Sequence, residues 1–151
     1  KRQSLDRARE EILWGLSQAD VVKISEDEVD FLWGCDPQEG AQRLLEEHGV
    51  SLAMVTLGSE GCLLANALGS VRVRGPKVTP VDTTGAGDIF GGSAVSRLLE
   101  LGKDPAQLNR EELLYVAQFA VTAASLSTQV PGGIPSIPDR AVVEQTMQEL
   151  G

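Results

Sequence analysis

The chain has 151 residues, of which 42% are hydrophobic, and its formal net charge at pH 7 is −9. This length and apolar fraction suit one domain with its own core. The negative charge disfavours nucleic acid and anionic membranes as partners, because binding to either rests on clustered Lys and Arg. No apolar run approaches the length that spans a bilayer. Cys35 and Cys62 lie too far apart in the sequence for a C-x-x-C motif, which argues against a zinc site and a disulfide framework.

Periodicity and end signals predict helices that alternate with short strands. Residues 20–24 are apolar without alternation, which is typical of a buried parallel strand. Asp36 and Pro37 are favourable residues for the N-cap and first position of a helix. The two strands after residue 61 are expected to form an antiparallel hairpin. In chain order, we expect helix 4–18, strand 20–24, helices 25–34 and 37–48, strands 52–57, 62–67 and 71–74, and helices 88–101, 110–127 and 139–150.

This order of elements predicts the fold class. Strands that alternate with helices favour an α/β fold with three layers, α/β/α, around a mostly parallel sheet. The helix over residues 110–127 is apolar almost all round, so it should be buried. No internal repeat, low-complexity tract or interdomain linker divides the sequence.

The run VDTTGAGDIFGG, residues 81–92, combines a glycine-rich turn, a carboxylate and the start of a helix. Gly85 and Gly87 leave the backbone open to a ligand, and the helix would direct its unpaired N–H groups and positive dipole end at an anion. Asp88 would then lie in the first helical turn, beside the bound charge. A structural interpretation stays open, in which the glycines form a tight turn and Asp88 only complements the helix dipole.

Two blocks further upstream also have a functional and a structural interpretation. Ser25 and Glu28 have the S-x-x-E spacing of a capping box, which starts a helix. The block VTLGSEGC, residues 55–62, either lets a ligand lie against the backbone of its glycines or simply connects two strands.

Together these blocks resemble the signatures of the ribokinase-like (PfkB) carbohydrate kinases, in the order that the family uses. DTTGAGDIFGG is similar to the C-terminal signature, ADVVKISEDE to the strand with an Asn-x-x-Glu element, and VTLGSEGC to the T-x-G-x-x-G turn. Serine stands here in place of the asparagine, and GGIPSIP, residues 132–138, resembles a weaker fourth block. The resemblance runs from about residue 19 to the C-terminus and is greatest to fructokinases. It implies the C-terminal, nucleotide-binding half of the ribokinase-like fold, without the N-terminal half that holds the sugar and carries the lid.

The resemblance further implies ATP-dependent phosphorylation of a sugar hydroxyl in a cytoplasmic enzyme. Asp88 matches the catalytic base of the family. The amides of Gly85, Ala86, Gly87 and Asp88 match its anion hole, whose donors face the charge on the transferring group. The positions that match ATP contacts are Ser25, Thr56, Leu57, Gly58, Ser59, Glu60, Gly61, Gly87, Asp88 and Val121. Val121 is equally consistent with a simple core position.

Metal ions and partners also follow from the resemblance. Glu28 matches a residue that lies near Mg²⁺ and its water shell. A set of carbonyl and hydroxyl oxygens would suit a monovalent cation such as K⁺, and the matching positions are Asp82, Thr84, Ser127, Val130, Gly132 and Ser136. The expected partner is a small-molecule sugar, with a homo-oligomer for the full-length protein and no nucleic acid or membrane.

A second function from another class remains open, namely a nucleotide-binding module or truncated remnant that binds ATP without phosphorylating anything. As an isolated fragment the chain is expected to be inactive, because the residues that choose the sugar lie mainly in the other half of the family. If strands of that half normally continue the sheet, residues 20–24 should expose an unpaired strand edge and an apolar surface.

Overall fold

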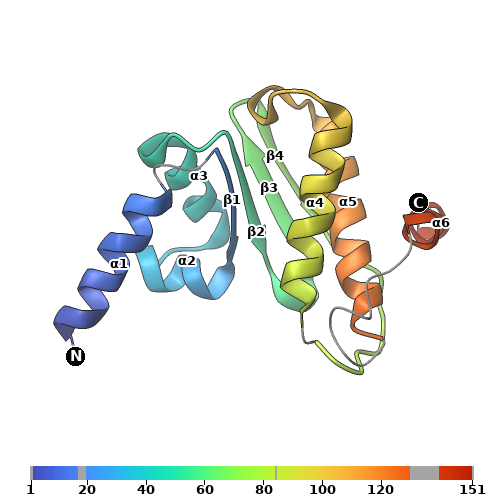
Figure 1. Ribbon diagram of the computed structural model, residues 1–151, viewed down its shortest axis with the longest axis horizontal. Helices are drawn as coiled ribbons and strands as arrows, with labels where there is room; N and C mark the ends of the chain where they lie inside the picture. Colours follow the sequence, from blue (N-terminus) through green and yellow to red (C-terminus); the bar gives the residue numbers. More distant parts are fainter. Residues whose placement is uncertain (1, 17–19, 84, 130–139, 151) are drawn as a thin grey trace.

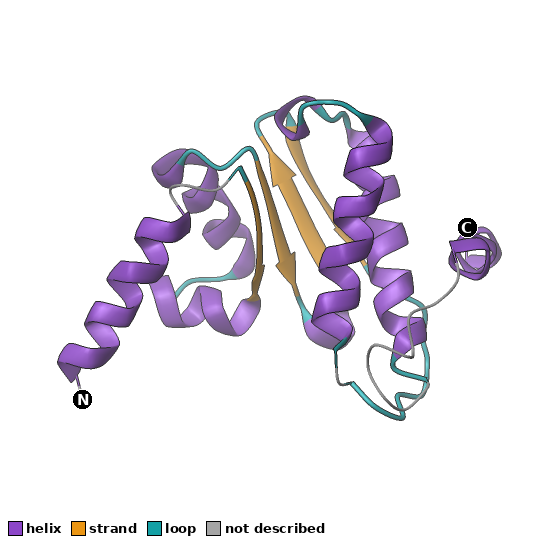
Figure 2. Ribbon diagram, viewed as in Figure 1, coloured by secondary structure: helices purple, strands orange, loops and turns teal. Residues whose placement is uncertain are grey.

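A computed structural model describes residues 2–16, 20–83, 85–129 and 140–150. Four strands form one sheet with helices on both faces (Figures 1 and 2). In chain order the elements are α1 (Arg2–Leu16), β1 (Val21–Ser25), α2 (Glu26–Trp33), α3 (Pro37–His48), β2 (Leu52–Thr56), the 3-10 turn η1 (Gly58–Glu60), β3 (Cys62–Asn66), β4 (Gly69–Val73), α4 (Ala86–Leu101), the 3-10 turn η2 (Pro105–Gln107), α5 (Arg110–Ser127) and α6 (Arg140–Leu150).

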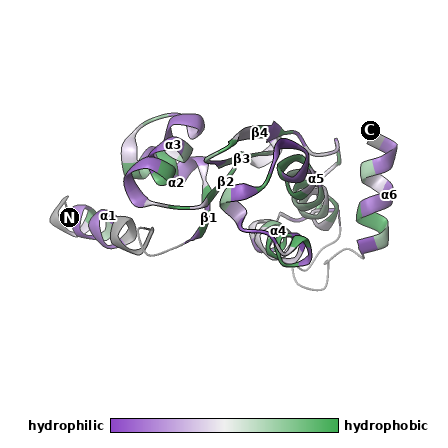
Figure 3. Ribbon diagram, turned by 90° about the horizontal axis from the view of Figure 1, so that it is seen from above, coloured by the Kyte–Doolittle hydropathy of each residue, from purple (hydrophilic) through white to green (hydrophobic). Residues whose placement is uncertain are grey.

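The three-layer α/β/α architecture is confirmed. The helices α2 and α3 cover one face of the sheet, and α4 and α5 cover the other (Figures 1 and 3). Two apolar clusters fill the spaces between these layers. Successive residues of β2 alternate between them: Leu52 and Met54 belong to the cluster under α4 and α5, and Ala53 and Val55 to the cluster under α2 and α3. Burial on both faces explains why this strand is a continuous apolar run.

The sheet is mixed rather than mostly parallel. Its strand order is β1-β2-β3-β4, in which β1 and β2 are parallel and the other two pairs are antiparallel. The lengths of the connections explain this result. Two helices lie between β1 and β2, which gives room for the crossover that parallel strands need, whereas short turns join β2 to β3 and β3 to β4 and force the chain to reverse. The hairpin expected after residue 61 is confirmed.

The edge strand β1 corrects one expectation and confirms another. Among the described strands it pairs with β2 alone, so the expected unpaired edge is present. The expectation of an exposed apolar surface at this strand is wrong, since Val22 and Ile24 expose only 5% and 2% of their area. Both pack with residues of α2 and α3. Lys23, which points to the other face, is the exposed residue between them.

The long helix α5 is buried, as its sequence predicts. Leu113, Val116, Ala117 and Ala120 are at most 1% exposed. The helix begins with a capping box in which Asn109 accepts from the amide of Glu112 while the Glu112 carboxylate accepts from the amide of Asn109. A well-defined start and a buried face therefore hold α5 against the sheet.

A buried asparagine connects the β3–β4 hairpin to the chain that precedes α5. Asn66 is 3% exposed. Its side-chain nitrogen donates to the carbonyl oxygens of Pro105 and Leu108 at 3.0 and 2.9 Å. Its side-chain oxygen accepts from the amides of Leu68 and Gly69 at 3.0 and 3.2 Å. All hydrogen-bonding positions of this amide group are thus used.

A charged network attaches α6 to α4. Arg140 pairs with Glu100 at 2.9 Å, and Glu100 also pairs with Arg97 at 2.6 Å. The hydrogen bond from Arg140 is the largest of the influences that hold the pKa of Glu100 below its ordinary value. The guanidinium of Arg97 lies over the ring of Phe119 on α5, 4.7 Å from its centre. Val143 adds an apolar contact, because it is 1% exposed and clusters with Phe119.

Candidate functional site

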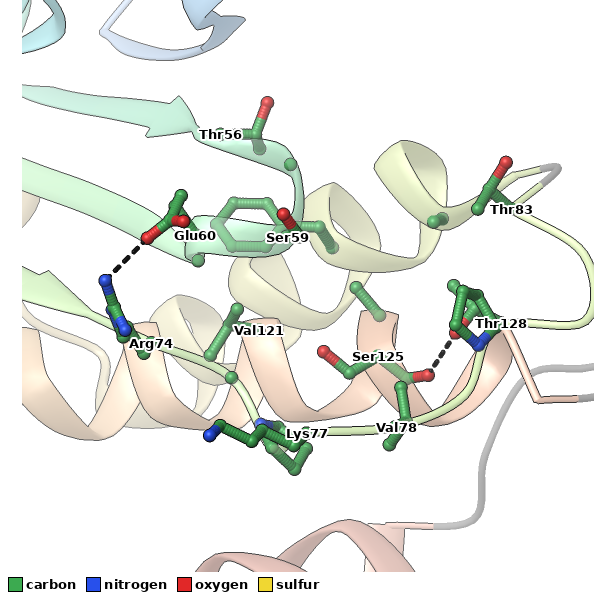
Figure 4. A pocket seen from close by; sticks show the side chains of 18 of the residues that line it. Thr56, Ser59, Glu60, Arg74, Lys77, Val78, Thr83, Val121, Ser125 and Thr128 are labelled. Carbon is green, nitrogen blue, oxygen red and sulfur yellow. Dashed lines mark hydrogen bonds and ion pairs between the residues drawn. The ribbon is translucent and has the colours of Figure 1, made fainter.

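A cleft of about 600 Å³ opens where η1, the start of α4 and one face of α5 meet (Figure 4). Its lining combines blocks that are far apart in the sequence. They are Thr56 with Gly58, Ser59, Glu60 and Gly61, then Arg74 to Val78 with Pro80, then Thr83, Ala86, Gly87 and Phe90, and the α5 residues Val121, Ala124, Ser125 and Thr128. Two of the three sequence motifs therefore face one space.

Two glycines allow the backbone segments around the cleft to lie very close together. Gly61 has φ +101°, and a Cβ added there would lie 1.9 Å from the carbonyl oxygen of Val73. At Gly75, an added Cβ would lie 2.7 Å from the Oγ of Ser125. A side chain at either position would push apart the segments that line the cleft.

Residues of the T-x-G-x-x-G turn divide between the cleft and the core. Leu57 is 2% exposed and packs in the cluster under α2 and α3, so it does not line the cleft. Its amide donates to the carbonyl of Gly61 at 2.9 Å, which closes the turn. Val121 lines the cleft and is also a member of the other core cluster, so the core interpretation is confirmed and its contact with ATP stays a prediction.

The S-x-x-E block lies beside the cleft, and its side chains bond to each other. Ser25 is the register partner of Thr56 across the parallel pair β1–β2, at the ends where ligands bind in open α/β sheets. Its Oγ accepts from the amide of Glu28 at 3.2 Å, and the Glu28 carboxylate accepts from the amide of Ser25 at 3.1 Å. The capping box is thus formed, and neither residue lines the cleft. A role of Glu28 near Mg²⁺ stays a prediction.

The helix α4 begins at Ala86, two residues before the start at Asp88 that the sequence pattern predicts. Gly85 is the N-cap, in the left-handed region with φ +77°. The amide of Ala86 donates to the carbonyl of Thr83 at 3.2 Å, so one of the four expected anion-hole amides is engaged in a turn. Within the described residues, which leave out Thr84, the amides of Gly85, Gly87 and Asp88 have no backbone acceptor.

Asp88 lies in the first turn of α4, directly after two residues that line the cleft. Its side chain is exposed, and it stands at the rim rather than in the lining. No hydrogen bond or ion pair within the described part of the chain engages its carboxylate. The carboxylate is therefore open to solvent beside the backbone amides at the start of α4.

Lys23 is a feature of the site that the sequence analysis missed. Its Nζ donates to the carbonyl oxygen of Gly87 at 3.2 Å. Its stem passes Gly91, where an added Cβ would lie 3.4 Å from the lysine Cδ. Lys23 therefore places a positive charge beside the first turn of α4, although it does not line the cleft. The available signal was the charge of Lys23 within the apolar run of residues 20–24.

Only part of the expected monovalent-cation site can be described. Thr84, Val130, Gly132 and Ser136 lie outside the described residues. The carbonyl of Thr128 accepts from the amides of Val81 and Asp82 at 2.7 and 2.9 Å, which holds Asp82 beside the end of α5. Ser127 is 2% exposed, and its Oγ donates to the carbonyl of Ala124 at 2.7 Å. Among the described residues, no three His, Cys, Asp or Glu side chains gather as metal ligands.

Comparison with known proteins identifies the family. The pfkB family carbohydrate kinase profile matches residues 2–140. The protein described as "Probable fructokinase-6, chloroplastic" from Arabidopsis thaliana is 42% identical over 147 residues, which are 95% of this chain and 38% of the plant protein. The chain belongs to the pfkB family of carbohydrate kinases.

Solved structures agree with this assignment. A fructokinase double mutant from Vibrio cholerae O395, in a fructose-, ADP- and potassium-bound form, matches with a TM-score of 0.80 and 32% identity, over 92% of this chain and 44% of that one. Fructokinase with bound ATP from Xylella fastidiosa matches with a TM-score of 0.82 and 25% identity, over 94% and 46%. The ribokinase-like fold is confirmed, and the chain spans less than half the length of these relatives.

Within the described residues, no helix is long and apolar enough to cross a membrane. The cytoplasmic location stays a prediction, and so does the homo-oligomer.

Proposed function

We propose that the chain is the nucleotide-binding half of an ATP-dependent sugar kinase with a fructokinase-like acceptor. The observation that carries this proposal is the shared cleft. It joins the T-x-G-x-x-G turn, Val121 and the first turn of α4, which come from three separate stretches of sequence. Its volume of about 600 Å³ lies in the range of small-molecule sites.

The charges support a triphosphate at the α4 end of the cleft. The net charge of −9 would repel ATP at long range, so binding must rest on local donors. The helix start supplies backbone amides and a positive dipole end, and Lys23 adds an ammonium group bonded to Gly87. A phosphate here would satisfy both the amides and the lysine.

The position of Asp88 supports its role as base. In phosphoryl transfer, the attacking oxygen and the leaving oxygen lie on opposite sides of the phosphorus atom. A base for the acceptor must therefore lie beyond the nucleotide, at the rim of its cleft, where Asp88 stands. The sugar oxygen bonds to the γ-phosphorus, the bond from that phosphorus to the β–γ bridging oxygen breaks, and Asp88 takes the hydroxyl proton. The products are a sugar phosphate and ADP.

The residues present fit Mg²⁺ bound mainly through phosphate and water. This ion usually keeps several waters and takes one or two carboxylates, and Glu28 retains an oxygen outside its capping box. Mg²⁺ bound there would neutralise charge on the phosphates. The oxygens that would hold K⁺ are those of Asp82, Thr84, Ser127, Val130, Gly132 and Ser136.

Replacing Asp88 by asparagine tests the proposal in a kinase-length protein that contains these 151 residues. Asp88→Asn keeps the shape of the side chain and removes its proton acceptor. We expect ATP affinity within about twofold of the parent, and a kcat for fructose phosphorylation lower by about 10²-fold or more. Asp104→Asn is the matched control, because Asp104 is exposed and caps η2, outside the cleft. Equal turnover by the Asp88 and Asp104 variants would refute the role.

A nucleotide-binding module without transferase activity is the second candidate, because Asp88 stands at the rim of the cleft and does not line it. The two candidates differ in one measurement. ATP binding with no phosphorylation of any sugar in a panel that includes fructose and ribose, by the natural gene product, would favour the module.

A further inference from the structure

An ion pair closes the end of the cleft farthest from the start of α4. The Nη2 of Arg74 lies 2.7 Å from the Oε2 of Glu60. Glu60 belongs to η1 and Arg74 follows β4, and both residues line the cleft. Figure 4 shows the pair at one end of the cleft and Thr83, near the helix start, at the other, with Val121 and Ser125 between them.

Folding stability does not account for this pair. The side chains of Arg74 and Glu60 are 76% and 53% exposed, and ion pairs this exposed contribute little to stability. The two segments that it joins already meet at Gly61 and Val73, where the backbones are in close contact. The effect of the pair is to hold a guanidinium group in place at one end of the cleft.

The cleft offers few other flat surfaces to a nucleobase. Phe90 is the aromatic residue of its described lining, and that side chain is 2% exposed. A guanidinium is planar and stacks on aromatic rings. With the phosphates at the α4 end, the base of a nucleotide extends toward Arg74.

We propose that Arg74 is a specificity-determining residue that packs its guanidinium plane against the nucleobase, and that Glu60 positions it. This inference rests on the proposed ATP binding and assigns the recognition of the base, as distinct from the phosphates, to this end of the cleft.

The experiment compares ATP with inorganic tripolyphosphate, which has the phosphates but no base. Binding of each is measured by calorimetry for the unsubstituted chain, Arg74→Gln, Glu60→Gln and Arg72→Gln. Arg72→Gln is the matched control, because Arg72 is an exposed arginine on β4 outside the cleft. Its substitution removes the same charge as Arg74→Gln. Circular dichroism of each variant verifies the fold.

We expect Arg74→Gln to weaken ATP binding about three- to tenfold relative to Arg72→Gln, and to leave tripolyphosphate binding equal to that of the control. Glu60→Gln should weaken ATP binding about twofold, and the double variant Glu60→Gln/Arg74→Gln should bind ATP as Arg74→Gln does, because the glutamate acts through the arginine.

Two results would overturn the inference while the proposed function stands: ATP affinity of Arg74→Gln equal to that of Arg72→Gln, or an equal loss for ATP and tripolyphosphate, which would indicate a charge effect. If the unsubstituted chain binds tripolyphosphate but not ATP, or neither, the proposed function fails and the inference with it.

Discussion

Replacing Gly61 by alanine perturbs both the cleft and the sheet through one added carbon. The new Cβ would lie 1.9 Å from the carbonyl oxygen of Val73 and 2.8 Å from the Cα of Arg74. Ordinary contact begins at 3.4 Å, so the Val73 carbonyl must move by about 1.5 Å. Val73 is the register partner of Cys62, so this movement strains the β3–β4 pair.

The expected cost has two parts. Gly61 has φ +101° and ψ −128°, and such backbone strain in a residue with a side chain costs about 1–3 kcal/mol. Overpacking against backbone adds about 1–3 kcal/mol. The free energy of unfolding should therefore fall by about 2–6 kcal/mol. Gly58→Ala is the matched control: Gly58 has φ +59° but open space around it, so it should lose only the left-handed strain, about 1–2 kcal/mol.

Urea unfolding followed by circular dichroism measures both variants. Midpoints that differ, with Gly61→Ala lower by the equivalent of at least about 1–3 kcal/mol, the overpacking that only this variant has, would support the reasoning. Equal losses in the two variants would refute it, because they would mean that the close approach of Gly61 to Val73 does not constrain the fold.

The remaining predictions concern buried groups away from the cleft. Asn66→Ala removes four hydrogen bonds and should lower the free energy of unfolding by about 3–4 kcal/mol. The control Asn109→Ala, which removes an exposed helix cap, should lower it by about 1 kcal/mol. Similar losses for the two variants in urea unfolding would contradict this prediction. Burial raises the pKa of the Cys62 thiol from 9.0 to about 12, so its contribution to stability is complete below pH 9 and declines as the pH rises toward 12. Stability measured between pH 8 and 10.5 should fall in the parent by up to about 1.4 kcal/mol per pH unit above pH 9, and Cys62→Ala should lack that part of the slope.

Local signals in the sequence predict most of the elements. Asp36 accepts from the amide of Glu39 as an N-cap, and Gly49 ends α3 in the left-handed conformation. The apolar run of residues 52–57 becomes a buried strand, and the three-layer arrangement follows from the alternation of helices and strands. Each of these signals acts over a few residues, so it can be recognised without knowledge of the rest of the chain.

The motifs predict two of the segments that line the cleft, but not the segment from Arg74 to Pro80, and not which of their own residues face it. Leu57 lies within the T-x-G-x-x-G turn and packs in the core, whereas Ser59 lines the cleft. Ser25 and Glu28 bond to each other, as either interpretation of their spacing allows. Whether a side chain of the turn faces the cleft or the core depends on the twist and pairing of the strands that carry the turn. A sequence pattern does not specify these.

Contacts between distant segments were decided by the tertiary structure. Lys23 reaches the carbonyl of Gly87 across 64 positions, Arg74 reaches Glu60 across 14, and both contacts depend on how the layers pack. The sequence by itself determined the helices, the strands and the family blocks, because these follow from interactions between near neighbours in the chain. The cleft, the cation beside the α4 start and the need for glycine at positions 61 and 75 arise only when the packed sheet and helices bring remote backbone and side chains within contact distance.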